Sequence, residues 1–173
     1  MNEQLTFESL KPEHATALFE LFQSEEIFRY IPEQPHATLQ SMQDEINSFI
    51  AGPRQDSGEA WLNWGILYGE AKKCIGTLQA TLFADGSLWI GYKLAQAYWG
   101  KGIATQSVSW LTGELHRRYP DLAIHASVDT RNGASIRVLE KIGFEVIRRE
   151  AAELHGLTSE DLILCATNPK PYR

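Results

Sequence analysis

A chain of 173 residues, of which 43% are hydrophobic and 22% charged, is long enough for one domain with a sizeable core and has the composition of a folded soluble protein. Its formal net charge of −6 argues against a non-specific nucleic-acid binder, which needs a basic face, and suits a cationic or amine-bearing substrate. The sequence has no apolar run near the roughly 20 residues of a membrane span and no signal-peptide-like N-terminus, so we expect a cytoplasmic protein with one domain over residues 1–173.

The two cysteines, Cys74 and Cys165, each lie in an apolar, strand-like run. Neither metal-ligand spacing nor a secreted disulfide framework accompanies them. We therefore expect two small buried residues with free thiols in a reducing compartment, and no metal ion.

The first fifty residues predict a strand followed by two helices. Residues 5–10 alternate like a strand, Lys11-Pro12 opens a helix, and apolar residues at steps of three and four predict a second helix over residues 38–50. The loop at residues 24–32 has more aromatic and charged residues than a connector requires. It is either a substrate-binding loop or a cover for the core.

Three strands follow, over residues 60–68, 74–83 and 88–94. Asp85-Gly86 lies between the last two, and this pair accommodates the positive φ of a hairpin turn. The middle of the chain is therefore predicted to be an antiparallel meander.

The last of these strands leads into a loop with two glycines and then into a helix, predicted over residues 103–117. The first amides of a helix have no intrahelical partner, and the peptide dipoles place roughly half a positive charge there. Gly100 and Gly102 let a phosphate approach the backbone, and Lys101 adds a cation. This junction is either an anion-binding site or an ordinary strand-to-helix turn that contains glycine.

A strand over residues 122–128 completes a strand–helix–strand crossover, which places it parallel to the strand over residues 88–94. A polar loop at residues 129–132 leads to a helix over residues 133–142. Gly143 lies where a left-handed residue ends a helix.

Two short strands, over residues 144–148 and 162–166, come last, and residues 168–173 have the composition of a frayed tail. Together the elements predict an α/β fold. We expect a mixed, strongly twisted central sheet with helices on both faces.

Two windows, W-G-K-G-I-A-T at residues 99–105 and R-N-G-A-S-I-R-V-L-E-K-I-G-F at residues 131–144, occur on this frame. Together they resemble the GNAT superfamily of N-acetyltransferases. Within it they resemble the ribosomal-protein N-terminal (alanine or serine) acetyltransferase group, with its G-Y-x-L…W-G-K-G-x-A-T and N-x-x-S-x-x-V-L-E-K-x-G-F. The resemblance covers most of the chain in the order and type of elements. It implies a GNAT-like fold and acetyl-CoA-dependent transfer of an acetyl group to an amine.

The resemblance also implies where acetyl-CoA binds. Backbone amides of the glycine loop would hold the pyrophosphate of coenzyme A, as the helix-terminus argument suggests; the matching residues are Trp99, Gly100, Lys101, Gly102, Ile103 and Ala104. The strand before the loop would splay from its parallel neighbour, so that Leu94 and Ala95 pair with the pantetheine arm and an amide stabilises the reacting oxyanion. Asn132 matches a cofactor-contacting asparagine, and it is also a good helix N-cap.

The sequence departs from the family pattern at two positions. Trp99 stands where glutamine or arginine is common, which removes one side-chain contact to phosphate. Leu139 stands where many members carry a tyrosine as general acid for the departing thiolate. Ser135, one turn earlier on the same helix face, matches a serine that can serve this role in the N-terminal acetyltransferase group. A serine in a first helical turn is also favoured without any function.

An ammonium group cannot attack a thioester, so a base must take its proton. The resembling group places its base after Phe144, where Glu153 is our first candidate and Glu150 our second. Either residue is alternatively a solvated charge in a charged loop. The strand position near Leu88 and Trp89, where other members keep a base, has no carboxylate.

A modest base favours an α-amine, because roughly one α-amine in ten is neutral at pH 7 but only about one lysine side chain in a few thousand. We therefore expect a protein or peptide N-terminus as acceptor. A small-molecule amine, such as a polyamine, an amino acid or an aminoglycoside-like compound, is the alternative. The segments expected to select the acceptor are residues 27–32, the helix over residues 38–50, and residues 150–156.

Two other interpretations remain open. Gly100-x-Gly102 could begin a dinucleotide-binding fingerprint with Asp129 as the ribose ligand, but Thr105 stands where the third glycine or alanine belongs. The phosphate-binding loop of NTPases, G-x-x-x-x-G-K-[ST], is absent from the sequence. Alternatively, a GNAT-like module could bind acyl-CoA as a sensor without catalysis. Turnover with an amine acceptor would distinguish the sensor from the enzyme.

Overall fold

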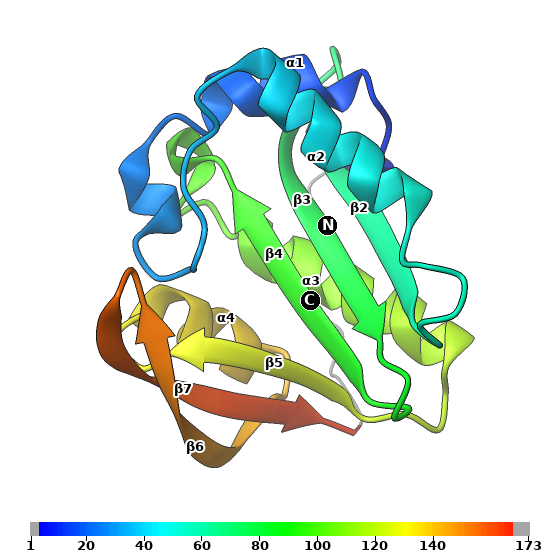
Figure 1. Cartoon of the computed structure of the whole chain (residues 1–173), viewed down its shortest axis with the longest axis vertical. Coiled ribbons are helices and arrows are strands. Elements are labelled where there is room, and N and C mark those ends of the chain that lie inside the picture. Colours follow the sequence, from blue (N-terminus) through cyan, green and yellow to red (C-terminus); the bar gives the residue numbers. More distant parts are fainter. Residues whose placement is uncertain (1–3, 168–173) are drawn as a thin grey trace.

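The fold is built on one sheet, whose strands are β1 (Leu5–Ser9), β2 (Ala60–Tyr68), β3 (Lys73–Leu82), β4 (Leu88–Leu94), β5 (Ile124–Asp129), β6 (Glu145–Leu154) and β7 (Leu157–Ala166). The computed structural model describes residues 4–167, and the tail expected at residues 168–173 lies outside them. The seven strands follow the order β1-β2-β3-β4-β5-β7-β6 and form a twisted sheet (Figure 1).

The first four strands form the expected antiparallel meander. The hairpin between β3 and β4 turns at Asp85-Gly86, as predicted. Gly86 has a φ of 84°, and the Asp85 carboxylate accepts a hydrogen bond of 2.8 Å from the Ser87 amide. Aspartate and glycine thus serve this turn for the reasons that make the pair common in hairpins.

Strands β4 and β5 are parallel, as the crossover predicts, but they are paired only at their first residues. The ladder between them joins Leu88 to Ile124 and Trp89 to His125. Past these pairs the two strands diverge, and Figure 1 shows β4 turning away from β5 toward its C-terminal end. The splay implied by the family resemblance is therefore present, and it opens a gap in the middle of the sheet.

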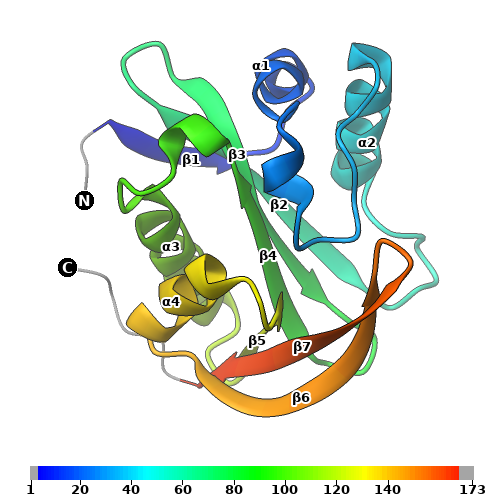
Figure 2. The same ribbon diagram turned by 90° about the vertical axis from the view of Figure 1, so that its left-hand side faces the viewer.

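Helices cover both faces of the sheet, as expected. The longer ones are α1 (His14–Leu21), α2 (Leu39–Ala51), α3 (Ile103–Arg118) and α4 (Gly133–Lys141), and the short 3₁₀ helices are η1 (Glu25–Phe28) and η2 (Gln96–Tyr98). Figure 2 shows α1 and α2 on one side of the sheet and α3 and α4 on the other. No helix within residues 4–167 has both the length and the apolar character needed to cross a membrane.

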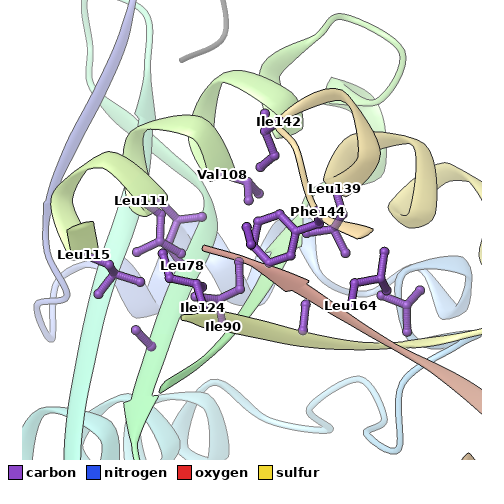
Figure 3. Close-up of a cluster of buried hydrophobic side chains, with 14 of the residues drawn as sticks. Leu78, Ile90, Val108, Leu111, Leu115, Ile124, Leu139, Ile142, Phe144 and Leu164 are labelled. Atoms are coloured by element: carbon purple, nitrogen blue, oxygen red, sulfur yellow. The ribbon is translucent and has the colours of Figure 1, made fainter. Parts of the chain in front are cut away.

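Each helical layer encloses its own apolar cluster. Under α3 and α4, the residues at steps of three and four pack on alternating residues of the strands (Figure 3); this cluster includes Leu78, Ile90, Val108, Leu111, Leu115, Ile124, Leu139, Ile142, Phe144 and Leu164. Under α1 and α2, a second cluster includes Leu18, Phe22, Phe28, Met42 and Ile46. The two clusters thus pack against the sheet from both sides.

The last two strands are longer than predicted, since they extend as one hairpin from Glu145 to Ala166. They meet at His155-Gly156, where both residues have positive φ, 51° and 77°. Residues 150–154 therefore belong to a strand, not to a charged loop. The prediction missed this extension because β6 is an edge strand whose residues are almost all exposed, so no apolar alternation marks it.

The cysteines are free, and Cys74 is buried as expected. Burial raises the pKa of its thiol to about 12, which makes it unreactive. Cys165 is only partly buried, so the expectation of a second fully buried thiol was wrong.

Candidate active site

Backbone groups of β4 line the gap between the diverging strands. The amide of Ala95 donates to the carbonyl oxygen of Ile75 on β3, 2.9 Å away, so Ala95 faces β3. Neighbouring residues of an antiparallel strand turn their backbone groups to opposite sides, and those of Tyr92 and Leu94 therefore face β5. Because the β4–β5 ladder has ended before these residues, their backbone groups face the gap.

The carbonyl oxygens at the end of β4 have partners within the fold. The indole N–H of Trp99 donates to the Leu94 oxygen at 2.8 Å, and the Tyr98 amide donates to the Ala95 oxygen at 2.9 Å. Of the two residues expected to pair with pantetheine, only Leu94 has a backbone amide that can do so. Both backbone groups of Ala95 are already hydrogen-bonded within the protein.

The glycine loop joins the C-terminal end of β4 to the start of α3. Gly100 and Gly102 both have left-handed backbones, with φ of 72° and 75°. The first helical hydrogen bond runs from Gln106 N to Gly102 O (3.1 Å), so the amides of residues 103–105 have no acceptor within the helix. Within the described residues no side chain caps this end. Such an arrangement fits the pyrophosphate of coenzyme A.

Two side chains of the loop point back into the protein's own framework. Lys101 Nζ donates to the Ala97 oxygen at 2.9 Å and lies 5.3 Å from the centre of the Tyr98 ring. Trp99 is 43% exposed and is tied to β4 through Leu94, as described above. Here Trp99 braces the loop where other family members place a side chain for phosphate.

An ion pair between an exposed arginine and a buried aspartate fixes the loop between β5 and α4. The Asp129 side chain is buried, and the Arg131 guanidinium donates to both of its oxygens at 2.9 and 2.7 Å. These hydrogen bonds hold the pKa of the Asp129 carboxyl below its usual value. The interpretation of Asp129 as a ribose ligand is therefore wrong, because Arg131 occupies its carboxylate.

Asn132 begins α4 and carries the expected N-cap. Its side-chain oxygen accepts a hydrogen bond of 3.1 Å from the Ser135 amide, in the first turn. This contact holds the first turn of α4 and its serine at the gap. At Leu139, where many family members have a tyrosine, the side chain is fully buried in the core (Figure 3).

A tyrosine hydroxyl reaches Ser135 from the other side of the gap. Tyr92 Oη lies 2.6 Å from Ser135 Oγ. Burial raises the pKa of the Tyr92 hydroxyl to about 12. Tyr92 was not predicted from the sequence, although alternation along β4 places it on the same face as the core residues Ile90 and Leu94, where a hydroxyl needs a partner.

The two candidate bases, Glu150 and Glu153, are exposed on β6. The Glu150 carboxylate accepts from Arg148, whereas Glu153 makes no side-chain hydrogen bond or ion pair with any described residue. No contact within residues 4–167 joins Glu153 to Ser135. Of the two, Glu153 is therefore the carboxylate without a partner among the described residues, and it lies near the tip of the β6–β7 hairpin.

The hairpin tip meets the loop that follows α1. The His155 ring lies 3.1 Å from the Phe28 oxygen through Nε2 and 3.0 Å from the Gln34 amide nitrogen through Nδ1. Both views show the tip of β6–β7 beside this loop (Figures 1 and 2). The same loop reaches β4 through an ion pair of Glu33 with Lys93. Two of the segments expected to select the acceptor are thus in contact.

The chain was compared with known proteins. The family model of the acetyltransferase (GNAT) domain matches residues 4–145. The probable N-acetyltransferase YjcK of Bacillus subtilis (strain 168) is 30% identical over 83% of this chain and 81% of that protein. The chain is thus related to acetyltransferases over most of its length.

Two solved structures are similar in fold. An acetyl transferase from Salmonella typhimurium that modifies the N-terminal serine of a 50S ribosomal subunit protein has a TM-score of 0.80 at 17% identity, over 95% of each chain. The microcin C7 self-immunity acetyltransferase MccE, solved with acetyl-CoA and AMP, has a TM-score of 0.78 at 19% identity, over 95% of this chain and 93% of that chain. With the family match, these findings support the enzyme and not the sensor or the dinucleotide-binding protein. The chain belongs to the GNAT family and is an acetyl-CoA-dependent acetyltransferase.

Proposed function

We propose that this acetyltransferase modifies the α-amine of a protein or peptide N-terminus. The observation that carries the proposal is the kind of base that the site offers. Among residues 4–167 the only buried carboxylate is Asp129, which is engaged by Arg131, and the free candidate, Glu153, is exposed. An exposed carboxylate is a modest base. It suits an α-amine, with a pKa of about 7.7–8.0, far better than a lysine side chain at about 10.4.

In this proposal Glu153, directly or through water, takes a proton from the acceptor's ammonium group and passes it to solvent. The nitrogen lone pair then forms a bond to the acetyl carbon. The C–S bond breaks, and its electron pair goes to sulfur. Ser135 donates its hydroxyl proton to that sulfur and is reprotonated by the second proton lost from nitrogen. The products are the acetylated amine and the free thiol of coenzyme A.

We propose that acetyl-CoA binds from the start of α3 to the gap. The loop residues Trp99 to Ala104 would surround the pyrophosphate, with the amides at residues 103–105 as donors. The Leu94 amide would pair with the pantetheine arm, and a β4 amide facing the gap would stabilise the negative charge that develops on the carbonyl oxygen. Asn132 would contact the cofactor through its amide nitrogen, since its oxygen caps α4.

A small-molecule amine is the second candidate. The contacts of His155 join the hairpin tip to the loop after α1, and we propose that these two segments together enclose a compact acceptor. MccE, whose structure contains AMP, shows that the same fold occurs in an acetyltransferase of a different kind.

The test is release of free coenzyme A from acetyl-CoA with matched acceptors. The panel contains peptides beginning with alanine or serine, the same peptides with a blocked N-terminus and an internal lysine, and small amines that include polyamines, amino acids and aminoglycosides. We expect turnover with the free N-termini and none with the blocked peptides. Turnover confined to the small amines would overturn the proposal in favour of the second candidate.

A further inference from the structure

The hydroxyl groups of Tyr92 and Ser135 form a short bridge between β4 and α4, with 2.6 Å between the oxygens. We propose that Tyr92 is a positioning residue, whose hydroxyl donates to Ser135 Oγ and thereby turns the proton of Ser135 toward the gap. This inference rests on the role proposed above for Ser135. It concerns how the serine proton is aimed, and Tyr92 itself need not touch the substrates.

The direction of the hydrogen bond follows from the chemistry of the two hydroxyls. Each hydroxyl carries one proton, so only one of the two can donate in this contact. A phenol is the better donor, because its oxygen lone pair is delocalised into the ring. The other acceptor near Tyr92 Oη is the Ser135 carbonyl oxygen, at 3.5 Å, which is at the limit of a hydrogen bond. Ser135 Oγ is therefore the acceptor, and its own proton is free to point elsewhere.

The Tyr92 hydroxyl is held next to Ser135 Oγ by the packing of its ring. Its ring is partly buried and packs against the core cluster, and burial raises the pKa of its hydroxyl to about 12. The hydroxyl therefore keeps its proton at neutral pH and remains a donor to Ser135 Oγ.

Ser135 is held from two sides at the point where the strands diverge. Its amide donates to the cap residue Asn132 at 3.1 Å, which fixes the backbone of the first turn. The cap leaves the side chain free to rotate among its staggered rotamers, and the contact with Tyr92 selects one of them. Loss of the Tyr92 hydroxyl should therefore reduce the fraction of bound complexes in which the serine proton is aimed correctly. A smaller fraction of correctly oriented complexes lowers kcat and leaves the affinity for acetyl-CoA unchanged.

The experiment is a double-mutant cycle of Tyr92→Phe and Ser135→Ala, with the amine that the enzyme acetylates fastest. Phenylalanine keeps the ring in the core and removes only the hydroxyl. We expect Tyr92→Phe to lower kcat by about 5- to 20-fold, the effect of one hydrogen bond, with the KM and Kd for acetyl-CoA within about twofold of wild type. Ser135→Ala should lose more, about a hundredfold. The double variant should match Ser135→Ala, because Tyr92 acts only through Ser135.

The matched control is Tyr119→Phe, which removes a hydroxyl beyond the end of α3 and should leave kcat unchanged. Unchanged kcat in Tyr92→Phe overturns the inference. So does a double variant whose loss is the product of the two single losses, since Tyr92 would then act independently of Ser135. Wild-type turnover in Ser135→Ala overturns the role of the serine and this inference together. Because the cycle uses the fastest amine, an error in the proposed acceptor class is detected by the peptide panel and not here.

Discussion

The indole N–H of Trp99 donates to the carbonyl oxygen of Leu94, 2.8 Å away. This bond joins the glycine loop to the last residue of β4, and so connects the two stretches of backbone that we propose for acetyl-CoA. Trp99 therefore makes the glycine loop more rigid, because its hydrogen bond to Leu94 stands in place of a side-chain contact to phosphate.

Trp99→Phe should weaken acetyl-CoA binding without unfolding the protein. The variant keeps an aromatic ring and loses one neutral hydrogen bond, which contributes about 1 kcal/mol, so we expect the Kd for acetyl-CoA to rise by about fivefold. Calorimetry measures the change. The control is Trp61→Phe on β2, which removes an indole N–H that donates to the Glu59 carboxylate at 2.9 Å. An unchanged Kd in Trp99→Phe would show that the brace does not organise the binding site.

Gly100→Ala tests whether the loop binds the cofactor. A Cβ at Gly100 would meet nothing within 4 Å, and its φ is 72°, so the change introduces backbone strain of about 1–2 kcal/mol and no clash. Gly86 in the β3–β4 hairpin has the same open surroundings and a φ of 84°. Gly86→Ala should therefore lose similar stability in urea. Only Gly100→Ala should lose acetyl-CoA affinity, by about tenfold or more, and equal affinities would contradict a phosphate site in this loop.

The periodicity of apolar residues was enough to predict most of the fold. Val108, Leu111 and Leu115 are spaced for one helix face, and they pack in the core as that spacing requires. The same signal is absent from β6, where Val146 and Ile147 are both about half exposed. A strand at the edge of a sheet has little to bury, so its length is set by pairing with β7, which a local pattern does not reveal.

The candidate site was predictable only where local backbone geometry dictates the residue. Gly100 and Gly102 need left-handed backbones, and that need is visible in the sequence. The bridge between Tyr92 and Ser135 joins residues 43 positions apart, and it depends on the packing of β4 against α4. Nothing in the sequence indicates that two hydroxyl groups so far apart along the chain are in contact.

Asp129→Asn should make stability less dependent on pH in acid. Arg131 holds the pKa of Asp129 below its usual value of about 3.9, so the ion pair stabilises the folded state above about pH 4 and is lost as the pH falls through the lower, folded-state pKa. At pH 7 we expect the variant to lose about 1–3 kcal/mol in urea unfolding. The difference from wild type should shrink below about pH 4.

The control for this prediction is Asp56→Asn, since Asp56 pairs with Arg54 on the exposed surface. Exposed pairs contribute little, so this variant should follow the wild type across the pH range. Equal stability of Asp129→Asn and wild type at pH 7 would show that the ion pair of Asp129 with Arg131 does not hold the β5–α4 loop.

Glu153→Gln should lower kcat/KM by up to about tenfold at pH 7, because an amide cannot take the proton from the acceptor's ammonium group and only roughly one α-amine in ten is already neutral. The loss should shrink as the pH rises through about 8, where the α-amine is already neutral. A pH profile of kcat/KM measures this recovery. Glu160→Gln, which changes an exposed carboxylate paired with Arg149 on the same hairpin, is the control. If Glu150→Gln instead shows the loss and the recovery, the base is Glu150.

His155→Gly should weaken binding of the acceptor and leave binding of acetyl-CoA unchanged. Glycine accommodates the φ of 51° at this turn, and Gly-Gly is a favoured pair in two-residue hairpins, so the hairpin itself should persist. The change removes the hydrogen bonds to the Phe28 oxygen and the Gln34 amide, which hold the hairpin tip against the loop after α1. Two such bonds contribute about 1–2 kcal/mol, and we expect the KM for the acceptor to rise by about 5- to 20-fold with the KM for acetyl-CoA unchanged. The control is His116→Ala in the last turn of α3, since glycine would destabilise that helix, and this variant should change neither KM. A rise in both KM values would mean that the hairpin tip also affects binding of acetyl-CoA. If neither KM rises, the acceptor does not bind at the hairpin tip.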